Sequence, residues 1–224
     1  MKKLTTLVLL ASTLSCQSQN IQPMEPIIDN KFEVFDNNKY IELAEKNKKS
    51  QEHFDENGNY LQMIKANAGS ATYFTSKNSY FTIFKEYYKS GRINKKGLKF
   101  NVWGGFNFGT WYEFDEQGKL IKEIDYDKPF KFTFEDLLKF CEKEKIRVDK
   151  GPILQSTGYH TKIRRGVKNE KPWWEIEHLK KPDLIETIKL DGISGEIFRH
   201  KPYDAYVFYF NLRLISREYS FNRT

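Results

Sequence analysis

Histidines and paired glutamates are the residues of this chain best suited to acid–base or metal chemistry. The four histidines stand far apart in the sequence, at His53, His160, His178 and His200. None belongs to a His-Glu-x-x-His arrangement, and the sequence contains no Cys-x-x-Cys, so it lacks the usual ligand spacing of a zinc site. We therefore predict no metal site and no cofactor.

Glu175 and Glu177 are two residues apart, which places both carboxylates on the same face of an expected strand. Such a pair can act as acid and base, but solvated charges beside the adjacent tryptophans are the simpler interpretation. We predict no catalytic residue. The alternative is a dispersed carboxylate and histidine site, in which a deep pocket would bring His160 or His178 to one of these glutamates.

Arginine and tryptophan form a third group with chemical potential. The basic stretch from Lys162 to Lys171 contains Arg164 and Arg165 and is followed by Trp173 and Trp174. Guanidinium groups bind carboxylates and phosphates, and both residue types are enriched at binding hot spots. We predict that the arginines lie in a loop and that one indole faces outward, because successive strand residues point to opposite faces. These four residues are the predicted binding site for an acidic or aromatic partner surface; the alternative is a solvated loop beside two covered indoles.

The first sixteen residues have the order of an export signal. Lys2 and Lys3 precede an apolar stretch that ends in small residues and is far too short to span the ~30 Å of hydrocarbon in a bilayer. The ending Thr13-Leu14-Ser15-Cys16 resembles the lipobox of bacterial lipoproteins, with Thr13 where most lipoboxes carry Leu. The resemblance implies that residues 1–15 are a signal peptide and that Cys16 is lipidated; the alternative is an ordinary signal peptide with a chance cysteine.

Composition limits the class of protein. Removal of residues 1–15 leaves about 209 residues and lowers the formal charge from +7 to +5, because Lys2 and Lys3 are lost. Aromatic residues make up 16% of the chain, enough to build a core and to exclude global disorder. We expect no nucleic-acid partner for an exported protein. With Cys16 lipidated, Cys141 is the one thiol left, so we expect it to be buried and expect no intramolecular disulfide.

The chain divides into four parts: 1–15, 16–50, 51–128 and 129–224. Residues 17 to about 37 are polar and proline-spaced, as suits a tether, and Asn38 to Lys49 can form a short helix. The third part repeats a pattern of aromatic residue, polar turn, glycine and apolar residue around Gly58, Gly91 and Gly118. It resembles the MORN-like β-hairpin repeats of exported bacterial proteins, of the YwqK type. This resemblance implies hairpins that bury a face by stacking on their neighbours.

The last part begins with a helix. Thr133 to Asp136 has the pattern of a capping box, and an apolar stripe follows at Phe134, Leu137, Leu138 and Cys141. We expect strands around Ile153 and over 161–164, 173–178, 184–190, 196–200 and 205–215. Residues 129 to about 202, through their segments 172–177 and 188–197, resemble the core of the PepSY and PepSY-like family. Its members are small α+β inhibitory, chaperone-like or binding modules outside the membrane.

Taken together, these patterns predict an α+β protein of antiparallel hairpins with one amphipathic helix packed on a C-terminal antiparallel sheet. They favour a non-catalytic lipoprotein of the bacterial cell envelope, held through Cys16 on the periplasmic side of the outer membrane. The expected function is binding or inhibition, as in an immunity-type module, with an envelope protein or toxin as partner. The alternative is an envelope hydrolase with a dispersed carboxylate and histidine site.

Overall fold

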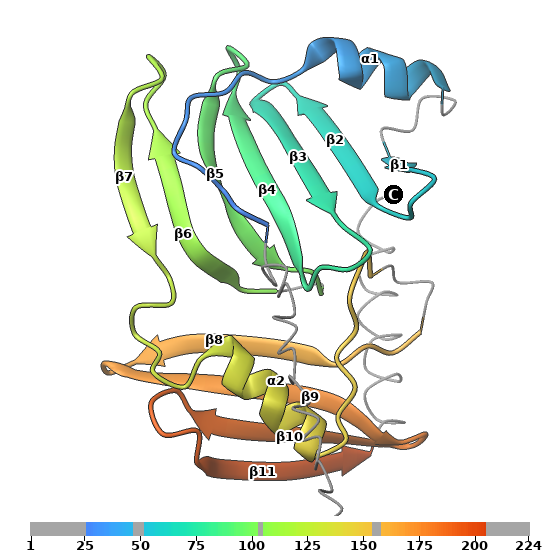
Figure 1. Ribbon diagram of the computed structural model, residues 1–224, viewed down its shortest axis with the longest axis vertical. Coiled ribbons are helices and arrows are strands. Elements are labelled where there is room, and N and C mark those ends of the chain that lie inside the picture. Colours follow the sequence, from blue (N-terminus) through green and yellow to red (C-terminus); the bar gives the residue numbers. More distant parts are fainter. Residues whose placement is uncertain (1–25, 47–51, 103–104, 154–157, 205–224) are drawn as a thin grey trace, which may run out of the picture.

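Two antiparallel sheets and two helices form the described part of the molecule. The computed structural model describes residues 26–46, 52–102, 105–153 and 158–204, and Figure 1 shows these elements in chain order. The predicted α+β fold of antiparallel hairpins with a helix on a C-terminal sheet is confirmed. Cys16 and the expected strand at 205–215 lie outside the described residues.

The first sheet is a meander in which each strand pairs antiparallel with the next along the chain. Its order is β1-β2-β3-β4-β5-β6-β7. The strands are β1 (Glu52–Phe54), β2 (Tyr60–Ala66), β3 (Gly69–Thr75), β4 (Phe81–Tyr88), β5 (Ile93–Phe100), β6 (Asn107–Phe114) and β7 (Leu120–Asp125).

Three of its turns carry the glycines that the sequence singles out. Gly58, Gly91 and Gly118 have φ values of 80°, 82° and 89°, a region that glycine adopts without steric cost. The first and third turns share one hydrogen-bond pattern. In each, an aspartate, Asp55 or Asp115, accepts from the backbone N–H groups two and four residues later. The predicted hairpin turns are confirmed at these positions.

Residues 29–35, here called the strap, cross one face of the first sheet and lead into α1 (Asn37–Lys46) (Figure 1). The sequence predicts a tether up to residue 37, but the strap is packed. Backbone hydrogen bonds join Phe35 N–H to Gly91 O at 2.8 Å and Ile93 N–H to Glu33 O at 3.0 Å. Phe35 is buried together with Leu43 of α1. The strap therefore belongs to the folded body.

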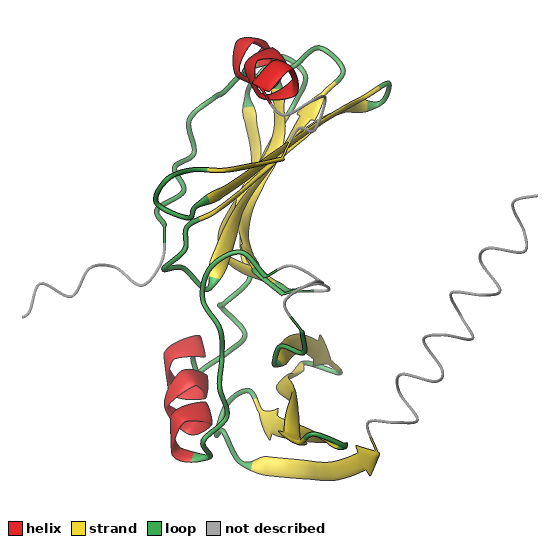
Figure 2. Cartoon of the chain, turned by 90° about the vertical axis from the view of Figure 1, so that its right-hand side faces the viewer, coloured by secondary structure: helices red, strands yellow, loops and turns green. Residues whose placement is uncertain are grey.

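The second layer consists of α2 (Phe134–Lys143) and a four-stranded sheet. The sheet has the order β11-β10-β9-β8 and comprises β8 (Lys162–Lys168), β9 (Lys171–Lys181), β10 (Leu184–Asp191) and β11 (Ile197–Asp204). Ile153, where the sequence predicts a strand, lies in irregular structure. Figure 2 shows α2 beside this second sheet and α1 at the far end of the first sheet.

The predicted capping box of α2 is confirmed. Thr133 Oγ1 accepts from the N–H of Asp136, and the Asp136 carboxylate accepts from the N–H of Thr133, both at 3.2 Å. Phe134, Leu137 and Cys141 are buried, and burial raises the pKa of the Cys141 thiol to about 12. The apolar stripe thus faces the core as expected.

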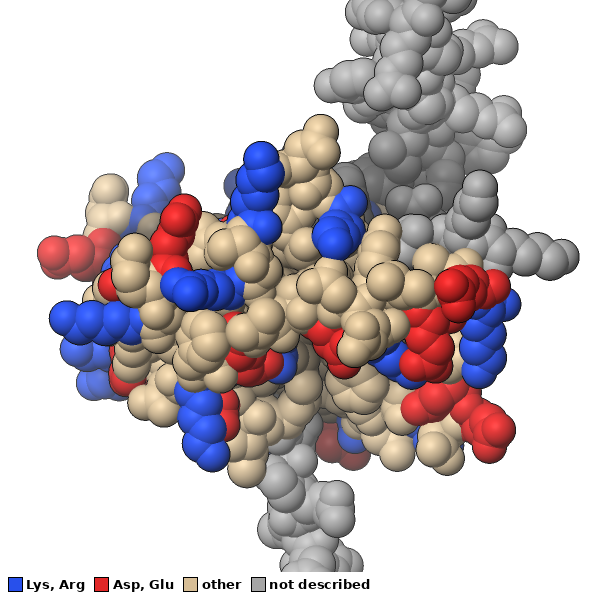
Figure 3. Space-filling model, turned by 90° about the horizontal axis from the view of Figure 1, so that it is seen from above, with Lys and Arg blue, Asp and Glu red and all other residues tan. Residues whose placement is uncertain are grey.

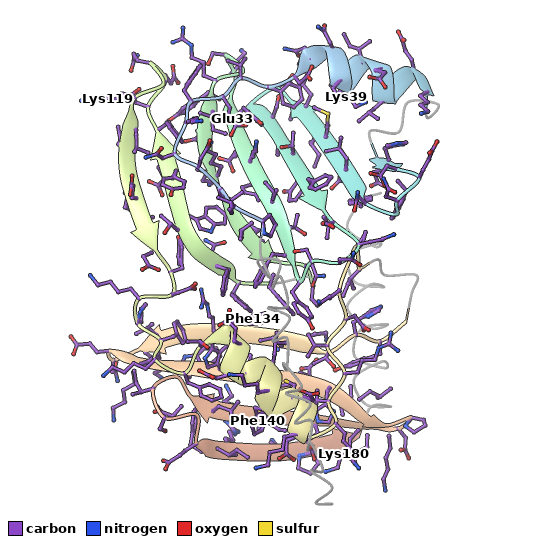
Figure 4. All side chains as sticks on the ribbon, viewed as in Figure 1. Glu33, Lys39, Lys119, Phe134, Phe140 and Lys180 are labelled. Atoms are coloured by element: carbon purple, nitrogen blue, oxygen red, sulfur yellow. The ribbon has the colours of Figure 1, made fainter. Side chains whose placement is uncertain are left out.

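The two sheets share one hydrophobic cluster, to which α2 also contributes. The ring of Phe134 lies 5.0 Å from that of Phe81 and 5.7 Å from that of Phe108, both in the first sheet. The same ring lies 6.3 Å from Trp174 of β9. Figure 4 labels Phe134 at the end of α2 that faces the first sheet. Among the described residues, no helix is long and apolar enough to cross a membrane.

Candidate functional site

The four residues of the predicted binding site fall on two opposite faces of the second sheet. Arg164 and Arg165 lie in strand β8, paired in register with Glu175 and Trp174 of β9. The prediction of a loop for the two arginines is therefore wrong, and the strand expected over 161–164 continues through Arg165 to Lys168. The charged stretch is held by ladder hydrogen bonds, and its turn is confined to Asn169 and Glu170, whose φ values are 51° and 62°. Positive φ at both positions is what a tight two-residue hairpin turn requires.

The face that packs on α2, here called the inner face, holds Arg165. Its side chain is only 4% exposed and joins the two sheets. Nη2 donates to Asn107 O at 2.6 Å and to Asp127 Oδ1 at 2.5 Å. The guanidinium carbon lies 4.6–5.4 Å from the centres of four aromatic rings, those of Phe106, Phe108, Phe130 and Trp174. Burial lowers the pKa of Arg165, and the nearby carboxylate of Asp127 opposes that effect.

The two indoles point to opposite faces, as predicted. Trp174 is fully buried on the inner face, and its Nε1 donates to Phe132 O at 3.0 Å. Trp173 is half-buried on the opposite, outer face. Arg165 and Trp174 are therefore parts of the core, which corrects their prediction as binding residues. Trp173 and Arg164 stay on a face that a partner can reach.

The outer face carries a ladder of ion pairs. Arg164 Nη1 donates to Glu175 Oε1 at 2.9 Å, and Lys189 Nζ donates to Glu175 Oε2 at 2.6 Å. Partial burial opposes ionisation, but the hydrogen bonds from Lys189 and Arg164 lower the pKa of Glu175. Glu177 accepts from Lys162 Nζ at 2.6 Å. Both glutamates are thus paired with cations. Carboxylates held in such ion pairs are poorly suited to act as an acid and a base.

At one end of the outer face lies a pocket of about 620 Å³ around Trp173. We call it the Trp173 pocket. Trp173 of β9 and Phe198 of β11 form its aromatic walls, and its cations are Lys168, Lys171, Lys189 and Arg199. Phe198 is the extra residue of a bulge, because Leu190 pairs with Ile197 and Lys189 with Arg199. The bulge leaves the Phe198 ring 59% exposed.

The cations of the Trp173 pocket differ in what they contact. Lys189 Nζ lies 4.9 Å from the centre of the Trp173 ring while it also pairs with Glu175. Lys168, Lys171 and Arg199 are exposed. Asp191, the acidic residue of the lining, accepts from the backbone N–H groups of the two residues that lie two and three positions on. These backbone hydrogen bonds, from Ser194 first, lower the pKa of Asp191.

A second pocket, of about 280 Å³, lies where the other end of the inner face meets the segment after α2. It is lined by both His160 and His178. His160 Nδ1 lies 2.7 Å from Asp149 Oδ2, and His178 Nε2 lies 3.0 Å from Glu186 Oε2. The carboxylates that meet these histidines are therefore not the predicted Glu175 and Glu177. Within the part of the chain that the structure describes, no group of three His, Cys, Asp or Glu residues could hold a metal ion.

The sequence predicts one of the residues that line the Trp173 pocket. Lys189, Phe198 and Arg199 come from β10 and β11, which meet β9 only through sheet pairing. The alternation of inward and outward side chains along β8 and β9 could have predicted that Arg165 is buried. Arg165 has the same parity as the apolar Ile163 and therefore shares its face.

Comparison with known proteins adds no relative. No protein family model, no curated protein and no solved structure matches this chain. The two sites that bear on function are the Trp173 pocket and the histidine pocket, the latter being the one lined by His160 and His178.

Proposed function

We propose that this protein is a non-catalytic lipoprotein of the bacterial cell envelope that binds a partner protein, as an inhibitory or immunity-type module. The signal-like segment before Cys16 supports export and anchoring, on the periplasmic side of the outer membrane. The resemblances to MORN-like hairpin repeats and to PepSY-like modules stay predictions that point in the same direction.

One observation carries the proposal: an aromatic pocket with exposed cations on the outer face of the second sheet. Trp173 and Phe198 offer apolar area that a partner can cover, and burial of such rings dominates the energy of many interfaces. The surrounding Lys168, Lys171 and Arg199 favour an acidic partner and speed its approach.

The distribution of charge elsewhere supports a protein partner over nucleic acid. Seen from above, over α1 and the neighbouring ends of the first sheet, Lys and Arg side chains are interspersed with Asp and Glu (Figure 3). Nucleic-acid binding proteins usually gather their cations on one face. We therefore propose no nucleic-acid partner.

The test is capture of the partner from an envelope extract. The bait is the mature chain from residue 16 onward with Cys16→Ser, compared with the same chain carrying Trp173→Ala. We expect Trp173→Ala to weaken binding of the captured protein at least tenfold, the scale of a hot spot. Phe74→Ala is the matched control, since Phe74 is an exposed ring on the first sheet. Failure of the wild-type bait to retain any protein, or equal retention by Trp173→Ala, would contradict the proposal.

A second candidate function, hydrolysis, is favoured by the pairing of His160 with Asp149 in the histidine pocket. A carboxylate on Nδ1 orients an imidazole and stabilises its protonated form, as general bases require. Chromogenic ester and peptide substrates test this function directly. Turnover that His160→Gln abolishes, and that Trp173→Ala leaves unchanged, would favour the hydrolase over the binding protein.

A further inference from the structure

We propose that the Trp173 pocket recognises an acidic peptide segment in extended conformation, with an apolar side chain between two carboxylates. This inference rests on the proposed function and specifies what the partner must present. It follows from the balance of charge in the pocket, from the strands that carry the cations, and from the depth of Trp173.

The balance of charge selects an anion. The lining holds four cations, and its carboxylate, Asp191, is already engaged by backbone N–H groups of its own turn. Lys189 is held between Glu175 and the Trp173 ring. Lys168, Lys171 and Arg199 remain as exposed cations around an apolar floor. A ligand with a single carboxylate would leave most of this charge without a partner.

The cations come from strands on both sides of Trp173. Lys168 and Lys171 flank the turn between β8 and β9, whereas Arg199 lies on β11, two strands beyond Trp173. Arg199 is level with Glu175, two residues beyond Trp173, so it lies roughly 10 Å from Trp173 across the strands and about 7 Å along them. Lys171 precedes Trp173 by two residues on the same strand, a rise of about 7 Å.

An extended peptide that runs along β9 meets a cation on either side of Trp173, because Lys171 lies two residues before it and Arg199 is level with the position two residues after it. Side chains two residues apart point to the same face and are separated by about 7 Å. An acidic residue two positions before an apolar one, and another two positions after it, would reach the cations on either side while the apolar side chain covers Trp173. The Arg199 guanidinium can take one carboxylate by two parallel hydrogen bonds.

A lipid surface would use the same residue types, and nearby Val167, Ile193 and Ile197 are exposed. The peptide is favoured because Trp173 is half-buried inside a concave pocket. A ring that inserts into a membrane interface projects from the surface instead. The membrane is therefore an outcome that the experiment must separate from the peptide.

Calorimetric titration of the Cys16→Ser mature chain with three synthetic peptides tests the inference. The probes are acetylated and amidated Glu-Ser-Phe-Ser-Glu, Gln-Ser-Phe-Ser-Gln and Glu-Ser-Ala-Ser-Glu. We expect the first to bind at least tenfold more tightly than either of the others in 50 mM salt. We expect the advantage over the glutamine peptide to shrink in 500 mM salt, because screening weakens exposed ion pairs. Equal affinities for the three peptides would overturn the inference.

Two variants localise the effect. Arg199→Gln should weaken binding of the acidic peptide at least fivefold, whereas Lys119→Gln, an exposed cation before β7 of the first sheet, should leave it unchanged. Stronger binding to phosphatidylglycerol vesicles than to the acidic peptide would overturn the peptide in favour of a membrane surface. If a partner is captured through Trp173 but the acidic peptide does not displace it, this inference fails while the proposed function stands.

Discussion

Glu33 of the strap and Lys96 of β5 form an ion pair with 2.5 Å between Oε1 and Nζ, although they are 63 positions apart in the chain. The Lys96 side chain is only 1% exposed. Its three N–H donors have three oxygen partners, because Asp29 Oδ1 lies at 3.0 Å and Lys31 O at 2.7 Å. The buried cation is thus satisfied, and it fixes the strap on the sheet (Figure 4 labels Glu33).

We expect Glu33→Gln to destabilise the fold by about 3 kcal/mol, because removal of one partner leaves a buried charge without full compensation. Lys96→Met should cost less, since the carboxylates that remain are partly exposed and Glu33 keeps its pair with Lys85. Urea unfolding measures both changes, with Lys31→Met as an exposed control. A larger loss in Lys96→Met than in Glu33→Gln would contradict this account of the pair.

The same pair predicts a dependence of stability on pH. Partial burial opposes ionisation, but hydrogen bonds from Lys85 and Lys96 lower the pKa of Glu33 below its ordinary value of 4.5. A carboxyl whose pKa is lower in the folded state stabilises the protein above about pH 4.5, and this contribution is lost as the pH falls through the folded pKa. The urea midpoint of the wild type should therefore fall more steeply below pH 4.5 than that of Glu33→Gln. Parallel curves would argue against the role of Glu33.

Adjacent arginines should respond very differently to substitution. Arg165→Gln removes a buried guanidinium with two hydrogen bonds and four ring contacts, and we expect a loss of about 3 kcal/mol. Arg164→Gln breaks a partly exposed ion pair and should cost at most about 1 kcal/mol. Thermal melts of the two variants measure the contrast, and similar shifts would show that Arg165 does not link the sheets.

Helix α2 offers three neighbouring positions with graded burial. Leu137→Ala should cost about 2–5 kcal/mol, because Leu137 is fully buried. Leu138→Ala should cost less, since that side chain is partly buried, and Lys139→Ala should cost under about 0.5 kcal/mol on the exposed face. Chemical denaturation of the three variants checks the order. Equal effects would mean that the buried face of the helix is misassigned.

Lipidation is tested by Cys16→Ser. If several acyl chains anchor the protein, each contributing about 0.8 kcal/mol per buried CH₂, their loss should release the chain into the soluble fraction. Fractionation followed by immunoblotting measures the distribution. Membrane association that is unchanged in the variant would rule out the lipid anchor.

Local signals of the sequence predict much of the fold. The box of Thr133 and Asp136, the stripe of Phe134, Leu137 and Cys141, and the turn glycines each depend on neighbours within a few residues. All of them are found as predicted. Capping boxes, apolar stripes and turns of this kind can be predicted because the residues that form them are close in the chain.

Those local signals do not predict contacts between residues that are far apart in the sequence. The strap resembles a tether in composition, and what holds it is Lys96, more than sixty residues away. Arg165 is buried because Asp127 and four rings from other elements surround it. Likewise, Arg199 joins Trp173 at one pocket only through the pairing of β9, β10 and β11. Sequence spacing does not reveal such pairings.

The placement of Phe134 between the two sheets determines how the chain can be divided. A fragment that ends at residue 128 would expose the rings of Phe81 and Phe108, which pack on Phe134 in the intact protein. The complementary fragment would lose the covering of Phe134 and the Asp127 partner of Arg165. Because the two sheets share one hydrophobic cluster, we expect them to unfold together and expect neither fragment to be stable alone.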